Sequence, residues 1–317
     1  MTTARRSLAV LGSPIGHSLS PTLHAAAYET LGLPFDYGRA EVESGSLAGF
    51  VDSLDPSWLG LSLTMPLKRE VLPLLDTVSP LASRLGVANT VVFDAEGRRH
   101  GHNTDVDGIV RSVELRHDAR PTAATILGGG ATAASALFSA WRLGARSISI
   151  RLRDPRRAGD LTALAADLGV EVDVAPLDEL ASSEPLDFVV STLPGGAADD
   201  LPIRPRDADS VLVDVAYEPW PTRLASRWAD GGGIVLSGLD MLVEQALSQV
   251  LLFRAGATAG ATATVGDDGD GDAPLDETRD AVRVREAMRR AVGLADRPTR
   301  ASSTRASSTP VGGGTPS

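Results

Sequence analysis

The chain contains no cysteine among its 317 residues. This absence excludes disulfides, thiol nucleophiles, cysteine-ligated zinc and iron–sulfur clusters together. The five histidines do not show the His-Glu-x-x-His spacing of a metal hydrolase, so we predict no metal site. Any chemistry must therefore come from hydroxyl, amide, carboxylate and amine groups.

Positive charge is also in short supply, because 30 lysines and arginines stand against 41 acidic residues, a formal net charge of -11. Binding to nucleic acid draws on a basic surface, so we expect no nucleic-acid partner. Long apolar runs are absent from the N-terminus, where residues 8–11 are followed at once by Gly12, Ser13 and Pro14. That run is too short for a signal sequence or a membrane span, and we expect a cytoplasmic protein without a membrane partner.

What the chain does have is a hydrophobic content of 43% and enough length for two domains. Short apolar runs alternate with amphipathic segments, which is typical of an α/β fold with largely parallel sheets. We predict strands at residues 7–12, 35–42, 58–64, 89–94, 98–103, 123–128, 147–152, 170–175, 186–192, 210–216 and 233–238. We predict helices at residues 20–31, 47–54, 67–73, 80–85, 131–143, 157–168, 239–253 and 276–294. In the first of these, we expect Ser20 to be the N-cap, Pro21 the first helical residue and Gly32 the residue just past the end.

Two segments have a composition that does not bury apolar surface. Residues 255–275 are rich in Gly, Ala, Thr and Asp, and we expect a flexible acidic insertion there. Residues 296–317 are rich in Ser, Thr, Pro and Gly, and we expect a disordered tail.

A glycine-rich turn follows the predicted strand at residues 123–128. Gly128, Gly130 and Ala133 form a G-x-G-x-x-A pattern at the opening of a helix, the context in which a dinucleotide pyrophosphate binds. The alternative is a tight turn without a ligand.

The next strand ends in a cluster of arginines, Arg151, Arg153, Arg156 and Arg157. Guanidinium groups at this place suit the 2′-phosphate of NADP, whereas Asp154 could hold the ribose hydroxyl of NAD. A solvated basic helix start is the third interpretation.

Polar clusters fall at strand ends in the first half of the chain, namely Ser18 with Ser20, the run at residues 62–68, Asn89, and the run at residues 101–105. Ligands of open α/β sheets bind beyond the carboxyl ends of strands, so these clusters could converge on one pocket. Each could instead serve a turn or a helix cap. Lys68 and Asp105 are the pair suited to proton transfer at a substrate oxygen, although a lone lysine is more often a surface residue.

Seven motifs together resemble the shikimate dehydrogenase family: GSPIGHSLSPTLH, SLTMPLK, GVANT, GHNTD, GGGAT, DVAYEPWPT and GLDMLVEQA. They occur in that family's order and spacing over residues 7–253, and residues 284–292 resemble its closing helix. The resemblance implies NADPH-dependent reduction of 3-dehydroshikimate to shikimate in aromatic biosynthesis. It also implies a substrate domain at residues 1–106, completed by residues 237–294, and a Rossmann-like, doubly wound NADP domain at residues 107–236.

The same motifs imply roles for individual residues. Lys68 and Asp105 match the catalytic pair, and Ser18 and Ser20, helped by Tyr217, match the groups that hold the substrate carboxylate. The partners implied for the rest of the substrate are Ser62, Thr64, Asn89, Asp105 and Gln245. The residues implied to bind the cofactor are Gly128, Gly129, Gly130, Ala131, Arg151, Arg153, Asp154, Arg157, Ser191, Thr192, Val215, Gly238 and Met241.

Some positions depart from the family pattern. Ser62 stands where asparagine is common, Ala131 adds a methyl to the glycine-rich turn, and Leu152-Arg153-Asp154 replaces the usual Asn-Arg-Thr. An NAD-dependent quinate/shikimate dehydrogenase, an aminoshikimate dehydrogenase and a non-catalytic cofactor-binding paralogue therefore remain alternatives. We expect a monomer or a homodimer.

Overall fold

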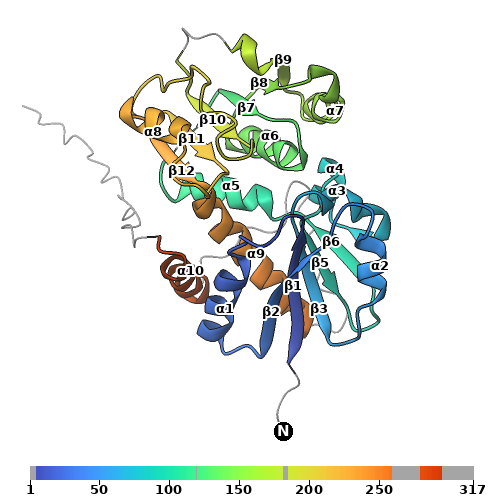
Figure 1. Cartoon of the computed structure of the whole chain (residues 1–317). Helices are drawn as coiled ribbons and strands as arrows, with labels where there is room; N and C mark the ends of the chain where they lie inside the picture. Colours follow the sequence, from blue (N-terminus) through green and yellow to red (C-terminus); the bar gives the residue numbers. More distant parts are fainter. Residues whose placement is uncertain (1–4, 119, 181–184, 259–278, 295–317) are drawn as a thin grey trace, which may run out of the picture.

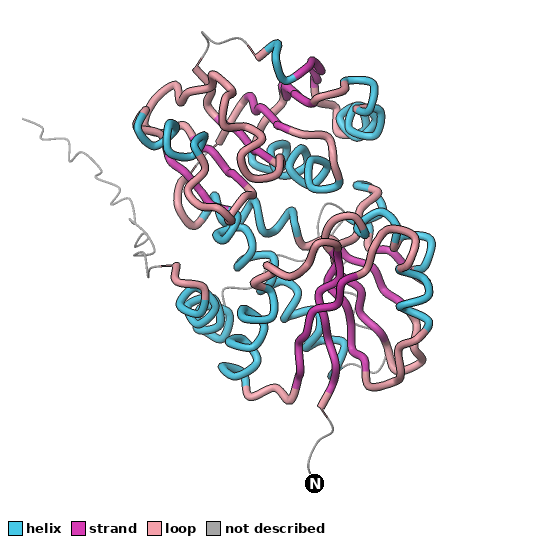
Figure 2. The backbone as a smooth tube through the Cα atoms, viewed as in Figure 1, coloured by secondary structure: helices cyan, strands magenta, loops and turns pink. Residues whose placement is uncertain are grey.

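The computed structural model describes residues 5–118, 120–180, 185–258 and 279–294, which form two lobes (Figure 1). Each lobe is built on one sheet with helices packed beside it (Figure 2). The predicted α/β class with two sheets is confirmed. Within these residues no helix is both long enough and apolar enough to cross a membrane.

The first lobe contains a mixed sheet in the order β2-β1-β3-β5-β6-β4. β1 pairs in parallel with β2 and β3, whereas β5 runs antiparallel to both β3 and β6, which confirms the predicted hairpin. The strands are β1 (Arg6–Gly12), β2 (Phe35–Glu41), β3 (Trp58–Leu63), β4 (Thr77–Val78), β5 (Thr90–Phe93) and β6 (Arg99–His102). The helices of this lobe are α1 (Ser20–Leu31), α2 (Leu47–Asp52), α3 (Leu67–Glu70), the 3₁₀ turn Leu72–Leu74 and α4 (Pro80–Leu85).

Helix α1 begins one residue earlier than its sequence suggests. Ser20 is the first helical residue, the N-cap is Leu19, and no side chain caps the helix. The prediction that Ser20 is the N-cap is therefore wrong, and its hydroxyl is not used to satisfy the helix end. Gly32 ends the helix as predicted, in the left-handed conformation with a φ of 64° that favours glycine.

The second lobe contains an entirely parallel sheet in the order β12-β11-β10-β7-β8-β9. The strand order reverses direction at β7, which is the doubly wound arrangement of dinucleotide-binding folds. The strands are β7 (Ala123–Leu127), β8 (Ser147–Leu152), β9 (Glu171–Pro176), β10 (Phe188–Ser191), β11 (Val211–Asp214) and β12 (Ile234–Ser237). The helices are α6 (Ala131–Leu143), α7 (Gly159–Asp167), α8 (Arg223–Asp230) and the 3₁₀ turns Pro155–Arg157 and Leu177–Glu179.

Two helices connect the lobes, α5 (Asp105–Glu114) and α9 (Gly238–Thr258). They pack closely because Gly108 has no Cβ, which would lie 2.9 Å from both the Cβ of Gln245 and the carbonyl oxygen of Met241. The far end of α9 reaches the first sheet, where a Cβ at Gly60 would overlap the ring of Phe253. Helix α10 (Arg279–Ala291) then packs against α1 and α9 (Figure 1).

The sequence predictions differ from the structure in a few elements. Helices α5 and α8 and the short strand β4 were not predicted. The flexible insertion was expected to start at residue 255, but α9 continues through Thr258. The rest of that insertion and the tail at residues 296–317 lie outside the described residues.

Candidate active site

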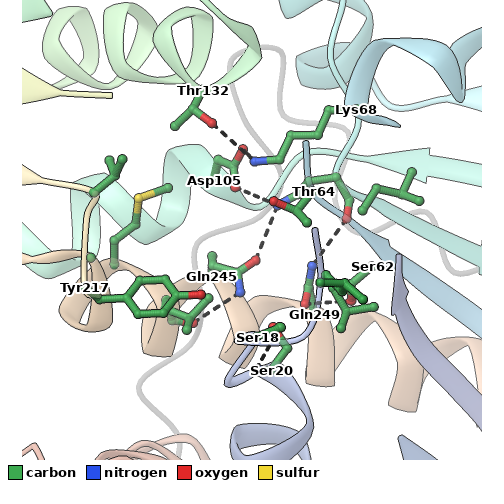
Figure 3. A pocket seen from close by; sticks show the side chains of 18 of the residues that line it. Ser18, Ser20, Ser62, Thr64, Lys68, Asp105, Thr132, Tyr217, Gln245 and Gln249 are labelled. Atoms are coloured by element: carbon green, nitrogen blue, oxygen red, sulfur yellow. Dashed lines mark hydrogen bonds and ion pairs between the residues drawn. The ribbon is translucent and has the colours of Figure 1, made fainter. Parts of the chain in front are cut away.

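A cavity of about 250 Å³ lies where the two lobes meet, beyond the carboxyl ends of β1 and β3 (Figure 3). Every residue predicted to be catalytic or to bind substrate lines it. These are Ser18, Ser20, Ser62, Thr64, Lys68, Asn89, Asp105, Tyr217 and Gln245. The strand-end clusters therefore converge on one pocket, as expected for an open α/β sheet.

Lys68 and Asp105 point toward one another at one end of the cavity (Figure 3). Lys68 Nζ lies 2.5 Å from Asp105 Oδ2, and the two side chains are only 11% and 4% exposed. Asp105 is also the first residue of α5, where the positive end of the helix dipole favours its negative charge. A buried ammonium held by a carboxylate beside a cavity is placed to exchange a proton with a ligand oxygen.

Asn89 connects this ion pair to the neighbouring amide groups. Its Nδ2 donates to Asp105 Oδ1 at 2.9 Å and to Thr104 Oγ1 at 3.0 Å, and lies 3.4 Å from Gln245 Oε1. Its Oδ1 accepts from the backbone N–H of Thr104 at 2.9 Å. Asn89 is 1% exposed, so these bonds fix the direction in which its amide faces.

Hydroxyl groups line a second part of the cavity. Ser18 comes from the loop between β1 and α1 and Ser20 begins α1, and Ser18 Oγ accepts from the backbone N–H of Ser20 at 3.3 Å. Tyr217 reaches the cavity from the second lobe, after β11 (Figure 3). Burial raises the pKa of Tyr217, and the charge of Glu218 adds to this, so the phenol stays a neutral hydrogen-bond donor. Three hydroxyls in one place suit an anionic group such as a carboxylate.

The structure adds residues that the sequence did not indicate. His17, Thr132, Leu242 and Gln249 line the cavity, and Lys68 Nζ lies 3.4 Å from Thr132 Oγ1. Gln249 stands four residues after Gln245 and shares its face of α9, so helical spacing alone could have found it. Thr132 follows the glycine-rich turn and gave no separate signal.

The residues predicted to bind a dinucleotide fall into two groups. Val215, Gly238 and Met241 line the same cavity as Lys68. The others lie outside the cavity lining, namely the glycine-rich turn, Ser191, Thr192, Arg151, Arg153, Asp154 and Arg157.

The glycine-rich turn itself fits a pyrophosphate. Gly128 has a φ of +114°, and a Cβ there would overlap the hydroxyl of Thr192. A Cβ on Gly129 would lie 2.7 Å from Leu152 Cδ1. Helix α6 begins at Ala131 with no side-chain cap on its first amides, and Gly130 adjoins open space. Free N–H groups at a helix N-terminus form an anion site.

Two of the four clustered arginines are paired with carboxylates. Arg151 donates to Asp173 Oδ2 at 2.6 Å and Arg156 binds both carboxylate oxygens of Asp154, so both of these guanidinium groups are engaged. Arg153 and Arg157 are exposed. Hydrogen bonds from Arg156 lower the pKa of Asp154, which stays charged.

Comparison with known proteins decides the family. Residues 10–91 match the model of the shikimate dehydrogenase substrate binding domain. The shikimate dehydrogenase (NADP(+)) of Sphingopyxis alaskensis is 33% identical over 251 residues, which cover 77% of this chain and 89% of that protein. The chain belongs to the shikimate dehydrogenase family.

Solved shikimate dehydrogenase structures share the fold. The Mycobacterium tuberculosis shikimate dehydrogenase is 33% identical with a TM-score of 0.71, covering 92% of this chain and 100% of that one. The Thermus thermophilus enzyme, solved in complex with NADP(H) and shikimate, is 29% identical with a TM-score of 0.68, covering 90% of this chain and 99% of that one. The predicted family and its Rossmann-like second lobe are therefore confirmed.

Proposed function

We propose that this chain is an NADP-dependent shikimate dehydrogenase, which interconverts 3-dehydroshikimate and shikimate. The observation that carries the proposal is the buried Lys68–Asp105 pair, set in a small cavity of hydroxyl and amide groups where the two lobes meet. Relatives with the same activity in their names are about one third identical over most of the chain. The reaction belongs to the biosynthesis of chorismate and the aromatic amino acids.

Lys68 is proposed as the general acid of the reduction. Lys68 Nζ would donate a proton to the oxygen of the ring carbonyl, while NADPH, when bound, would supply the hydride to its carbon. Asp105 holds the ammonium at 2.5 Å and, with Asn89, restricts where it lies. In the oxidation direction, Lys68 takes the proton from the substrate hydroxyl.

The remaining cavity residues are proposed to hold the substrate. Ser18, Ser20 and Tyr217 would bind the carboxylate through neutral hydroxyl donors. The ring hydroxyls would bind to Ser62, Thr64, Asn89 and Gln245. A site that pairs each hydroxyl rejects analogues that lack one, because its own buried polar groups are then left unpaired.

The second lobe is proposed to hold NADP, with the pyrophosphate on the N-terminus of α6. Arg153 and Arg157 are the exposed guanidinium groups proposed for the 2′-phosphate, because Arg151 and Arg156 are already paired with carboxylates. The amide N–H groups of the glycine-rich turn and the hydroxyl of Thr192, which lies beside Gly128, are proposed as further contacts of the cofactor.

One observation favours a second candidate. Asp154 is a charged carboxylate at the end of β8, where an NAD enzyme holds the ribose hydroxyls. A quinate/shikimate dehydrogenase that uses NAD is therefore the competing function.

Further proposals concern organisation. We propose that residues 1–106 with 237–294 act as the substrate domain and residues 107–236 as the cofactor domain. We further propose that the protein is a monomer or a homodimer in the cytoplasm.

The deciding experiment is steady-state turnover of the purified protein, followed by nicotinamide absorbance, with shikimate and quinate each tested against NADP⁺ and NAD⁺. A much higher kcat/KM for shikimate with NADP⁺ supports the proposal. A preference for NAD⁺ or quinate selects the competing function, and no turnover with any pair contradicts both.

A further inference from the structure

The floor of the cavity contains a glutamine with no remaining hydrogen-bonding capacity. Gln249 lies on α9 and is 1% exposed, and it lines the cavity together with Ser62, which is 3% exposed (Figure 3). Its Oε1 lies 2.9 Å from Ser62 Oγ and 3.2 Å from His24 Nε2. Its Nε2 lies 3.0 Å from Thr90 Oγ1 and 3.4 Å from the backbone carbonyl oxygen of Asn89.

The Asn89 carbonyl fixes which way this amide faces. A backbone carbonyl oxygen only accepts hydrogen bonds, so the group that faces it at 3.4 Å must be the NH₂ of Gln249. The reversed amide would bring two oxygens together. Gln249 Oε1 must therefore face Ser62 and His24, and both of these must donate to it.

Burial fixes the protons of the neighbouring side chains in turn. Burial lowers the pKa of His24 to about 3, so its ring is neutral, carries its proton on Nε2 and accepts on Nδ1 from the hydroxyl of Tyr28 at 2.8 Å. Ser62 has one hydroxyl proton, which it donates in its hydrogen bond to Gln249 Oε1. The hydroxyl of Tyr37 must therefore be the donor in its 2.7 Å bond to Ser62.

Ser62 consequently has no proton to offer a ligand. Its oxygen has two lone pairs, of which Tyr37 uses one. The other has no partner among the residues that the structure describes, and Ser62 lines the cavity. The two N–H bonds and two oxygen lone pairs of Gln249 are all occupied, so the glutamine itself offers nothing further to a ligand.

We propose that Gln249 is a specificity-determining residue, which makes Ser62 a hydrogen-bond acceptor only, so that this part of the cavity selects a substrate ring hydroxyl that donates. This inference rests on the proposed function, because it assigns Ser62 to a ring hydroxyl of shikimate. A substituent that cannot donate, such as fluorine, would face the Ser62 lone pair and be rejected.

The test compares shikimate with two analogues, each carrying fluorine in place of one of the two ring hydroxyls that are not oxidised. The measured quantity is the ratio of kcat/KM for shikimate to kcat/KM for each analogue. The variants are Gln249→Leu, which removes the acceptor of the Ser62 proton, and Ser62→Ala, which removes the hydroxyl. Ser248→Ala is the matched control, because this buried serine of α9 binds Asp107 at 3.4 Å and does not line the cavity.

We expect the native enzyme to prefer the hydroxyl by about 10- to 100-fold at one ring position, since a buried acceptor is otherwise left unpaired. At that position the ratio should fall about tenfold in Gln249→Leu, because the freed Ser62 proton can then turn to fluorine, and also in Ser62→Ala. Ser248→Ala should keep the native ratio.

The inference is overturned if Gln249→Leu keeps the native ratio at both positions, whether or not Ser62→Ala lowers it. Should Gln249→Leu not fold, Gln249→Met takes its place under the same criterion. Turnover of shikimate by the native protein is the prior condition. Its absence contradicts the proposed function, whereas unchanged ratios with normal turnover contradict this inference alone.

Discussion

Replacing Lys68 by methionine tests the role of its ammonium as a proton donor apart from the packing of its side chain. Methionine keeps most of the aliphatic stem but has no ammonium, so the general acid is removed while the cavity wall stays. General acid catalysis contributes about 10²- to 10⁴-fold, and we expect kcat to fall by that factor. KM for shikimate should change less than about threefold, because Ser18, Asn89 and the other proposed substrate groups keep their positions.

The same substitution has a calculable cost in stability. Asp105, with a side chain 4% exposed, would lose its partner at 2.5 Å and keep the Asn89 donor at 2.9 Å. Removing one partner of a buried ion pair costs about 3–5 kcal/mol, so the free energy of unfolding should fall by that amount. Asp105→Asn should lower kcat by a similar factor, and the double variant should be little worse than either single one, because the pair acts as a unit.

The assay is steady-state turnover combined with urea unfolding of each variant. Arg69→Met is the matched control, since this neighbouring cation of α3 is 37% exposed and pairs with Asp160 at 2.8 Å. Its kcat should stay within about threefold of native, because exposed ion pairs contribute little. A Lys68→Met enzyme with kcat within tenfold of native would refute the assignment of Lys68 as the acid.

Three other perturbations test the cofactor site, the packing and the pH dependence. Arg153→Ala and Arg157→Ala should each raise KM for NADP⁺ about 10-fold or more and change KM for NAD⁺ less than twofold, and equal effects on both cofactors would contradict a 2′-phosphate site. Gly108→Ala, measured by urea unfolding, should lower the free energy of unfolding by about 1–3 kcal/mol because the new methyl meets the α9 backbone at 2.9 Å. Gly49→Ala in α2, where a Cβ meets nothing within 4 Å, should instead gain up to about 1 kcal/mol, and similar losses at both sites would contradict the packing argument. Between pH 6.5 and about 3, the free energy of unfolding should fall by about 1.4 kcal/mol for each pH unit, because His24 takes up a proton in the unfolded chain but, with a pKa of about 3, not in the folded one. An NMR titration of the folded His24 ring with a midpoint near 6.5 would contradict this.

Local patterns predicted much of this fold because the relevant forces act within a few residues. Helix α6 and strand β8 begin and end where the apolar periodicity and the glycines place them. The cavity lining also followed from sequence, since polar side chains at strand ends must meet at one edge of a sheet. Motif resemblance then supplied roles that periodicity does not give.

Contacts between distant segments account for the features that the sequence did not predict. Helix α5 opens with the motif that was read only as a polar cluster, and its apolar face is defined by α6 and α9. The sequence did not indicate that the neighbouring strand β9 pairs Arg151 with Asp173, so the role of Arg151 in binding the cofactor stays a prediction. The role proposed for Gln249 depends on its hydrogen bonds to His24 and Ser62, which precede it by 225 and 187 residues.

Helix α9 shows why such contacts determine the site. Met241, Gln245 and Gln249, spaced by four residues, line the cavity. Asp240 precedes Met241 and Glu244 precedes Gln245. Because the helix turns by about 100° per residue, these two carboxylates face α10 instead. There Arg285 Nε binds both oxygens of Glu244 at 2.8 and 3.0 Å, and Arg289 binds Asp240 at 3.1 Å.

Breaking a buried pair of this kind leaves an uncompensated charge, so rotation of α9 about its axis is opposed by two carboxylates that would lose their partners. The cavity face cannot turn unless the α10 face turns with it. The ion pairs of Arg285 and Arg289 therefore help to hold α9 in the rotation that directs Gln245 and Gln249 toward the cavity. This coupling explains why a closing helix at the end of the described chain belongs structurally to a site whose first residues are Ser18 and Ser20.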